Sequence, residues 1–310
     1  MKLLFVADPL GDLKPGKDSS VAMMRAAVAR GHAVFAAEAR RLQVKDGIVH
    51  TCCDALEVRA DDDWYRVIRT DTLALTDFDT VLMRTDPPVD TDYLLATHLL
   101  GIAEASGARV LNRPAALRDF NEKLAILNFP QFVAPTFISA DATEIGNFLA
   151  VHHDIIVKPL TEMGGSGIFR LTRADPNRNA ILETLTRRGH RAIMAQRYLP
   201  AIAEGDKRIL LIAGEVVPWA LARIPQPGET RGNLAAGGIP RAQPLSPRDR
   251  EIAETVAPWA QANGVFLAGL DVIGDCLTEI NVTSPTGFQE IAAQTGHDAA
   301  AQFIAALERA

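Results

Sequence analysis

Short apolar segments alternate with helix-forming segments through the first third of the chain. The first apolar run, residues 2–7, ends at Asp8-Pro9, and the first helical segment is closed by Gly31, a residue that often follows a helix end. Strands that are apolar throughout are typical of a parallel sheet with helices on both faces. We therefore expect a doubly wound α/β domain in residues 1–120. Its predicted strands are residues 2–7, 33–37, 80–83 and 109–111, and its predicted helices are residues 21–30 and 93–105.

The rest of the chain has a different pattern, in which strands are paired through hairpins. We expect a central domain in residues 121–198 and a C-terminal domain in residues 199–310, so that the chain is α/β with an α+β C-terminal part. A long loop rich in Gly and Pro covers residues 225–244, and a loop of that length inside a compact protein is usually functional or disordered. The predicted helices are residues 115–127, 143–151, 180–187, 247–263 and 299–307, and the predicted strands are residues 155–160, 168–171, 192–199, 207–212, 216–223, 267–273 and 277–282.

Composition excludes several classes of protein. The 310 residues exceed one ordinary domain, and a net charge of −6 disfavours a nucleic-acid partner. The three cysteines have no C-x-x-C spacing, and no apolar run approaches the roughly 18 residues of a membrane span. We therefore expect a cytoplasmic protein with no membrane partner.

Residues 11–18, GDLKPGKD, nearly match the phosphate-binding loop G-x-x-x-x-G-K-[ST]. Asp18 stands where a hydroxyl should meet magnesium, and Pro15 lacks an N–H in a loop that must present N–H groups. A turn followed by a helix capped by Asp18 or Ser19 explains the segment better. A further possibility is that Asp18, Ser19 and Ser20 face a polar ligand at the carboxyl end of the first strand.

A glycine-rich segment, MGGSG at residues 163–167, lies between two predicted strands. Such a loop can cover phosphates with its backbone N–H groups, although glycine turns are also common in ordinary hairpins. Lys158 precedes it within the apolar run Ile155-Ile156-Val157, where a lysine is costly to bury without an anion. Lys123 could be its partner, or could lie on a solvated helix face. Together with the loop, Lys158 suggests a lysine that contacts nucleotide phosphates.

Asp271, Glu279 and Asn281 lie on the last predicted hairpin, with Glu279 and Asn281 on one strand face. A two-residue turn at Gly274-Asp275 would place Asp271 opposite Thr278, whereas a three-residue loop would place it opposite Glu279. We expect the second register, because three oxygen ligands then converge. Few carboxylates together with phosphates and water are what magnesium prefers.

Arginines are placed where they could neutralise a phosphoanhydride. Arg208 and Arg223 lie on predicted hairpin strands, and Arg84 ends a strand of the first domain. Arg231 lies in the glycine-punctuated long loop, which suggests a lid that closes over the substrate. Each arginine taken alone could be an ordinary surface residue.

These motifs, in this order, resemble the ATP-grasp superfamily and, more closely, the bacterial glutathione synthetases. The resemblance covers nearly the whole chain. Its strongest stretches are MRTDPP (83–88), LRDFNEKL (117–124), IIVKPLTEMGGSGIFR (155–170), AQRYLPAI (195–202), GDKRIL (205–210), PWALARIPQPGETRGNLAAGG (218–238) and GLDVIGDCLTEINVTSPTG (269–287). The last two separate this family from most other ATP-grasp ligases.

The resemblance implies an ATP-grasp fold and a ligase that joins γ-glutamylcysteine to glycine through an acyl phosphate, converting ATP to ADP and phosphate. It implies Mg²⁺ as the cofactor, with two ions and Mn²⁺ as a possible substitute, and a homo-oligomer, dimer or tetramer. The implied nucleotide-binding residues are Lys123, Lys158, Gly164, Gly165, Ser166, Gly167, Gln196, Tyr198, Leu199 and Asp206, and the implied metal ligands are Asp271, Glu279 and Asn281. The implied catalytic residues are Arg208, Arg223 and Arg231, and the implied substrate residues are Asp18, Ser19, Ser20, Arg84, Asn233, Ser284, Pro285 and Thr286.

Two positions depart from the family pattern, in which basic residues commonly stand where this chain has Ile239 and Gln289. Both are expected near the substrate side, so they bear on acceptor preference rather than on ATP binding. Two other hypotheses therefore stay open: another carboxylate–amine ligase with a different substrate, and an inactive nucleotide-binding regulator. Against the regulator, none of the expected lysines or metal ligands is replaced.

Overall fold

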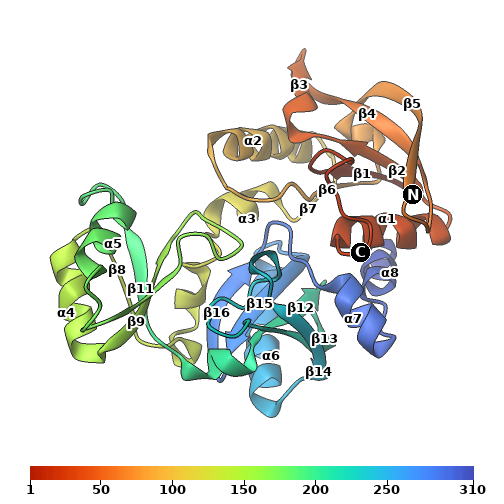
Figure 1. The fold of residues 1–310 in the computed structure, drawn as a ribbon. Helices are drawn as coiled ribbons and strands as arrows, with labels where there is room; N and C mark the ends of the chain where they lie inside the picture. Colours follow the sequence, from red (N-terminus) through yellow and green to blue (C-terminus); the bar gives the residue numbers. More distant parts are fainter.

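The computed structural model describes all 310 residues, apart from the side chain of Ala235. Three sheets form three lobes (Figure 1). The N-terminal lobe lies at the top of the view, the central lobe in green at its left and the C-terminal lobe in teal and blue below. Among the described residues, no helix is both long and apolar enough to cross a membrane.

The first sheet has the strand order β3-β4-β2-β1-β6-β7, with β5 paired to β4. Its parallel part confirms the strand–helix prediction, and alternate residues of β1 face opposite layers, as the period of a strand requires. Leu3 and Phe5 pack in one core with Met24 of α1, whereas Leu4 packs in another with Leu100 of α2. The parallel strands are β1 (Lys2–Val6), β2 (Ala33–Ala37), β6 (Thr80–Met83) and β7 (Val110–Leu111), and the helices are α1 (Ser19–Ala29) and α2 (Thr91–Ala105).

The segment between β2 and β6, in which no element was predicted, forms three antiparallel strands. These are β3 (Leu42–Lys45), β4 (Ile48–Val58) and β5 (Tyr65–Ala74). Buried Val49, Thr51 and Cys53 alternate with more exposed neighbours along β4, a two-residue period that was present in the sequence. The first sheet is therefore mixed rather than parallel throughout.

Helix α3 (Pro114–Asp119) is shorter than expected. The prediction that Asn121, Glu122 and Lys123 lie in this helix is wrong, because the Asn121 side chain caps the backbone locally. Its Oδ1 accepts from the N–H groups of Lys123 and Leu124, both at 3.1 Å, and such side-chain bonds compete with helix formation. The Lys123 side chain therefore extends from a turn and not from the solvated face of a helix.

The central sheet is antiparallel, in the order β10-β9-β11-β8, and carries two helices on one face. Both helices and three of the strands were predicted, but β8 was not. Its strands are β8 (Thr136–Ser139), β9 (Asp154–Pro159), β10 (Phe169–Thr172) and β11 (Ile193–Arg197). The helices are α4 (Ala142–His152) and α5 (Arg178–Leu185). Ile155 and Val157 of β9 point into the core between them, which leaves Lys158 on the other face of the strand.

The C-terminal sheet is antiparallel in the order β14-β13-β12-β15-β16. Its strands are β12 (Asp206–Ile212), β13 (Glu215–Ile224), β14 (Ile239–Pro244), β15 (Leu267–Ile273) and β16 (Cys276–Asn281), and its helices are α6 (Pro247–Ala262), α7 (Phe288–Thr295) and α8 (Ala299–Arg309). Strand β14 and helix α7 were not predicted. The long loop therefore ends at Gly238 rather than at residue 244, because residues 239–244 pair with β13.

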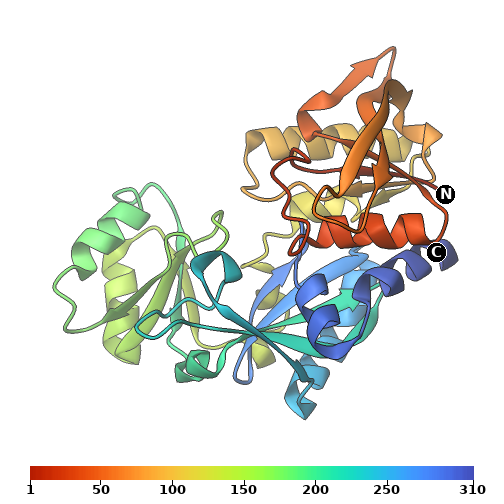
Figure 2. The ribbon, with the colours of Figure 1, turned by 45° about the vertical axis from the view of Figure 1, so that its right-hand side comes forward.

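The end of the chain returns to its beginning. Helix α8 packs against α1, and both termini lie on that side of the molecule (Figure 2). Arg30, just after α1, forms an ion pair with Glu308 of α8. This contact joins the first and last lobes.

Candidate active site

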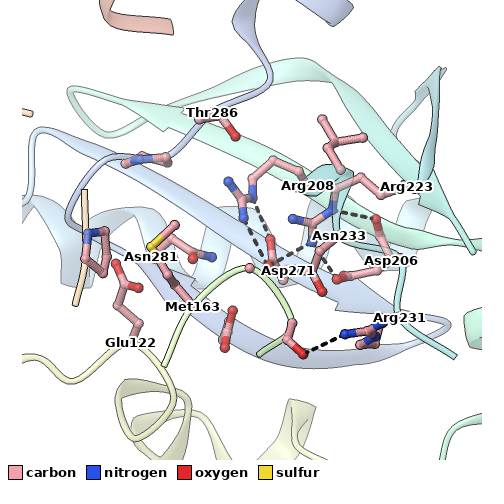
Figure 3. A pocket seen from close by; sticks show the side chains of 18 of the residues that line it. Glu122, Met163, Asp206, Arg208, Arg223, Arg231, Asn233, Asp271, Asn281 and Thr286 are labelled. Carbon is pink, nitrogen blue, oxygen red and sulfur yellow. Dashed lines mark hydrogen bonds and ion pairs between the residues drawn. The ribbon is translucent and has the colours of Figure 1, made fainter. Parts of the chain in front are cut away.

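A cavity of about 960 Å³ lies where the three lobes meet, and each lobe contributes to its wall. Lys158 enters from β9, Gln196 from β11 and Asp271 from β15, while Asp18 lines it from the segment before α1. Figure 3 shows how the charged side chains of the C-terminal sheet gather in this cavity. Most of the sequence-predicted residues are thus brought together from segments far apart in the chain.

Asp271 lies directly opposite Glu279 in the β15–β16 pair, which confirms the expected register. The expected three-residue loop is wrong, because Ile273 pairs with Cys276 across a two-residue turn. A register shift between Asp271 and Val272 then restores the Asp271–Glu279 pairing. A β-bulge thus produces the Asp271–Glu279 pairing that was expected from a longer loop. An extra residue in one strand shifts the register and changes the direction of the side chains that follow.

The Asp271 carboxylate is held by two arginines of the same sheet (Figure 3). Arg208 donates to both of its oxygens, at 2.5 and 3.1 Å, and Arg223 approaches to 2.8 Å. Burial would raise the pKa of Asp271, but the two guanidinium groups hold that pKa well below its usual value. Asp271 therefore stays ionised throughout the physiological range.

Arg223 also pairs with Asp206, at 2.5 Å. The second carboxylate oxygen of Asp206, Oδ1, is buried and has no hydrogen-bond partner in the described part of the chain. Burial outweighs the attraction of Arg223 and raises the pKa of Asp206 to about 7. An unpaired buried acceptor in a cavity wall suits a ligand that donates a hydrogen bond.

Lys123 and Lys158 differ in how their charge is balanced. Lys123 pairs with Glu279 at 2.9 Å and donates to the carbonyl of Glu162 at 2.6 Å, and Glu279 raises its pKa although burial opposes this. Lys158 donates only to the carbonyl of Thr278, at 3.3 Å, among the described residues, and burial lowers its pKa. A buried ammonium that lacks a contacting carboxylate is a suitable partner for an anionic ligand.

The glycine loop and the long loop meet over this cavity. Arg231 donates to the carbonyl of Gly165 at 3.5 Å and pairs with Glu229 at 2.6 Å. Gly165 has a φ of 85°, and a Cβ there would lie 2.8 Å from Oδ1 of Asn233. A side chain at residue 165 would therefore separate the two loops.

The metal-binding hypothesis can be tested on Asn281. Its Nδ2 donates to the carbonyl of Gly269 at 2.9 Å, which turns Oδ1 outward, and Oδ1 is not among the buried atoms that lack a partner. Asn281 lines the cavity with Asp271 and Glu279. Within the described residues, no three His, Cys, Asp or Glu side chains cluster closely enough to hold a metal alone. Two carboxylates and one amide oxygen fit a hard cation that phosphate and water also coordinate.

The part of the cavity wall next to the end of β11, called the apolar end here, contains several isoleucines. Gln196, Tyr198 and Leu199 line it, and the guanidinium of Arg170 stacks 3.8 Å from the centre of the Tyr198 ring. The isoleucines that line the same cavity are Ile156, Ile168, Ile202 and Ile273. Flat apolar walls of this kind suit a planar aromatic base.

The expected substrate residues divide into two groups. The cavity is lined by Asp18, Asn233 and the segment Ser284-Pro285-Thr286. Its wall does not include Ser19, Ser20 or Arg84. The expected nucleotide residue Gly167 is also not part of the wall. Arg84 instead donates to Oγ of Ser20 at 3.0 Å and to the carbonyl of Pro285 at 3.1 Å. Arg84 therefore holds Pro285, a residue of the wall, without lining the cavity itself.

Glu122 was not predicted from the sequence as a site residue, although it lines the cavity. Its Oε1 accepts from the N–H groups of Val282 and Thr283, at 2.8 and 3.0 Å, and from Oγ1 of Thr283 at 2.9 Å. These hydrogen bonds hold the turn that carries Lys123 against the residues that follow β16. Burial and nearby Glu279 raise the pKa of Glu122. The only feature of the sequence that could have indicated Glu122 is its charge next to Lys123.

Two family models match this chain and cover most of it. Residues 1–118 match the N-terminal domain of prokaryotic glutathione synthetase, and residues 122–296 match its ATP-grasp domain. The glutathione synthetase of Neisseria meningitidis serogroup A is 57% identical over 99% of this chain and 98% of that protein. The chain belongs to the prokaryotic glutathione synthetase family. The glutathione synthetase of Ralstonia nicotianae is 54% identical over 100% of this chain and 96% of that protein.

Solved structures support the fold of this glutathione synthetase family member. The D-cycloserine synthetase DcsG superposes with a TM-score of 0.70, covering 100% of this chain and 99% of that one, at 14% identity. At that identity the likeness speaks for the fold alone. Fold and family together make the chain an ATP-dependent ligase of the ATP-grasp type.

Proposed function

We propose that this enzyme joins the cysteinyl carboxylate of γ-glutamylcysteine to the amine of glycine, using ATP. The observation that carries the proposal is the convergence of Lys123, Lys158 and Arg208 on one cavity with the Asp271–Glu279 pair. Family membership at more than 50% identity over the whole chain supports the same reaction. Its products are glutathione, ADP and phosphate.

The reaction has two steps, and in both the chain mainly binds and orients the reactants. A carboxylate oxygen of the dipeptide attacks the γ-phosphorus of ATP, and the bond to the bridging oxygen of ADP breaks. The glycine amine then attacks the acyl carbon, phosphate leaves, and the amine loses a proton. We propose that Lys123 and Lys158 hold the phosphates, and that Arg208, Arg223 and Arg231 balance the charge of the transferred group, since phosphoryl transfer depends on positioning and charge.

Asp271, Glu279 and Asn281 are the residues that would hold Mg²⁺, and we propose two ions, with Mn²⁺ able to replace them. A divalent cation at this position would neutralise charge on the phosphate oxygens. Asp206, with its unpaired buried oxygen, would receive a donor from the nucleotide. The hydrogen bond from Arg231 to the carbonyl of Gly165 supports a closed arrangement in which both loops keep water from the acyl phosphate.

We propose that the dipeptide and glycine occupy the side of the cavity lined by Asp18 and residues 284–286. Arg84 and Ser20 would act there indirectly, by holding that wall. The three-domain division, with boundaries near residues 120 and 198, follows from the same proposal. We also propose a dimer or tetramer in the cytoplasm, on the basis of the family resemblance; light scattering measures the assembly.

Substrate-dependent ADP release tests the proposed reaction. We expect release only when γ-glutamylcysteine and glycine are both present, and a panel of other dipeptides and amines should give rates at least tenfold lower. If another pair gives the highest rate, the enzyme is a different carboxylate–amine ligase. If no pair gives ADP although ATP binds, the chain is a nucleotide-binding regulator.

A further inference from the structure

Thr136 lies behind the apolar end of the cavity and is not part of its wall. It pairs directly with Gln196 across β8 and β11, so both side chains leave the same face of the central sheet. Gln196 does line the cavity, and only 6% of its surface is exposed. The orientation of a side-chain amide so deeply buried is set by its hydrogen-bond partners.

The hydroxyl proton of Thr136 determines the orientation of the Gln196 amide. Oγ1 of Thr136 lies 2.7 Å from the carbonyl oxygen of Ala134, and a proton must lie between two oxygens at that distance. The carbonyl has no proton, so the Thr136 hydroxyl donates its only one to Ala134. Towards Gln196, 2.9 Å away, Thr136 can therefore only accept, and Gln196 must turn its Nε2 to it.

The amide oxygen of Gln196 consequently faces the other way. Oε1 has no hydrogen-bond partner among the described residues, and it is not one of the buried atoms that lack a partner. It is therefore open to the cavity that Gln196 lines. Ile156, which pairs with Gln196 on β9, and Tyr198 line the same apolar end. The base of a nucleotide placed there would meet a hydrogen-bond acceptor of fixed orientation.

We propose that Thr136 is a positioning residue that makes the enzyme select a 6-aminopurine nucleotide over a 6-oxopurine nucleotide. An adenine 6-amino group donates to Oε1 of Gln196, whereas a 6-oxo group places two acceptors against each other. The Gln196 amide cannot rotate to correct this, because the Thr136 hydroxyl would then face Oε1 with no proton to offer. This inference rests on the proposed ATP-dependent ligation.

The test compares ATP with inosine triphosphate, which differs from it at position 6 and at the protonation of the neighbouring ring nitrogen. Thr136→Val removes the hydroxyl and keeps the branched shape, and Thr136→Ser keeps the hydroxyl. We expect the ratio of kcat/KM for ATP to that for inosine triphosphate to fall about tenfold in Thr136→Val, the effect of one hydrogen bond. The change should lie mainly in KM. Thr136→Ser should keep the wild-type ratio.

Thermal unfolding of each variant without nucleotide gives the folding control. A ratio in Thr136→Val within twofold of wild type overturns the inference, and so does an equal loss in Thr136→Ser, because the hydroxyl would then not be the cause. The binding of the non-hydrolysable analogues of the two nucleotides, measured by calorimetry, gives a readout independent of turnover. If the wild type binds them selectively but never ligates, the proposed ligation fails, and the ratio of the two binding constants in Thr136→Val then decides the role of Thr136.

Discussion

Asp271 and Glu279 face each other across β15 and β16, yet different cations hold their carboxylates. Two arginines of the same sheet hold Asp271, whereas Lys123, from a turn outside that sheet, holds Glu279. The pair therefore joins a fixed charge cluster of the C-terminal lobe to a lysine from the preceding segment. The two carboxylates should consequently respond differently when they are replaced.

Glu279→Gln removes the proposed metal ligand and the partner of Lys123 while keeping the size of the side chain. We expect kcat to fall by about 10³-fold or more, because a divalent cation contributes several kcal/mol to the transition state. Steady-state ADP release measures this, with near-ultraviolet circular dichroism as a check on folding. The control is Glu57→Gln, which removes a carboxylate paired with Arg66 in the N-terminal lobe and should leave kcat unchanged. More than a tenth of the wild-type kcat in Glu279→Gln would contradict the metal assignment.

Gly165→Ala tests the contact between the glycine loop and the long loop. The new Cβ would lie 2.8 Å from Oδ1 of Asn233 and 3.3 Å from Cδ of Arg231, so the loops must separate. We expect kcat/KM for ATP to fall about tenfold or more, and proteolytic cleavage of the long loop to become faster. Gly228→Ala is a matched control, since Gly228 has the same φ of 85° and no atom within 4 Å of its Cβ position. Equal losses in the two variants would assign the effect to backbone strain alone.

Much of the fold followed from local sequence patterns. The parallel strands of the first sheet are continuous apolar runs, and the C-terminal hairpins have clear turn residues, so both were predicted. Strand β14 was missed because Gly, Pro and Arg dominate its surroundings, and its pairing with β13 is a long-range contact. Helix α3 was predicted too long because the Asn121 side chain overrides helix propensity.

The candidate site shows the same division. Residue type indicated Lys158 and Asp271, because charges within apolar strands are rare unless a partner requires them. The β-bulge that aligns Asp271 with Glu279 could not be predicted, since it depends on pairing rather than on composition. Arg84 has the residue type of a substrate ligand, but only the three-dimensional structure places it behind the wall.

Asn112→Ala should destabilise the joint between the first and last lobes. Its Nδ2 donates to the carbonyls of Leu267 and Val282, at 2.8 and 2.6 Å, and its Oδ1 accepts from the N–H groups of Phe266 and Leu267, at 2.7 and 2.8 Å. Four backbone groups, three of them in buried hydrogen bonds, would lose a partner, so we expect the free energy of unfolding to fall by about 3 kcal/mol or more. Urea unfolding measures it. Asn128→Ala, at an exposed residue, should change the free energy of unfolding by less than about 1 kcal/mol. Equal effects of the two variants would contradict the role of Asn112 in joining the two lobes.

The pH dependence of stability should reveal Asp206. Its pKa is raised from 3.8 to about 7 in the folded chain, chiefly by burial. Above pH 7 the carboxylate is ionised in both the folded and the unfolded chain, and its burial lowers stability. As the pH falls from about 7 towards 3.8, the folded chain binds a proton that the unfolded chain does not, so the free energy of unfolding contributed by Asp206 rises.

Asp206→Asn lacks this titration, and its amide oxygen can still accept from Arg223. We expect the free energy of unfolding of the variant, minus that of the wild type, to become more negative as the pH falls from 8 to 5. Contributions of all other titrating groups cancel in this difference unless they are coupled to Asp206. Urea unfolding of the nucleotide-free proteins at each pH gives the two values. A difference that stays constant over this range would show that Asp206 ionises in the folded chain near its usual pKa.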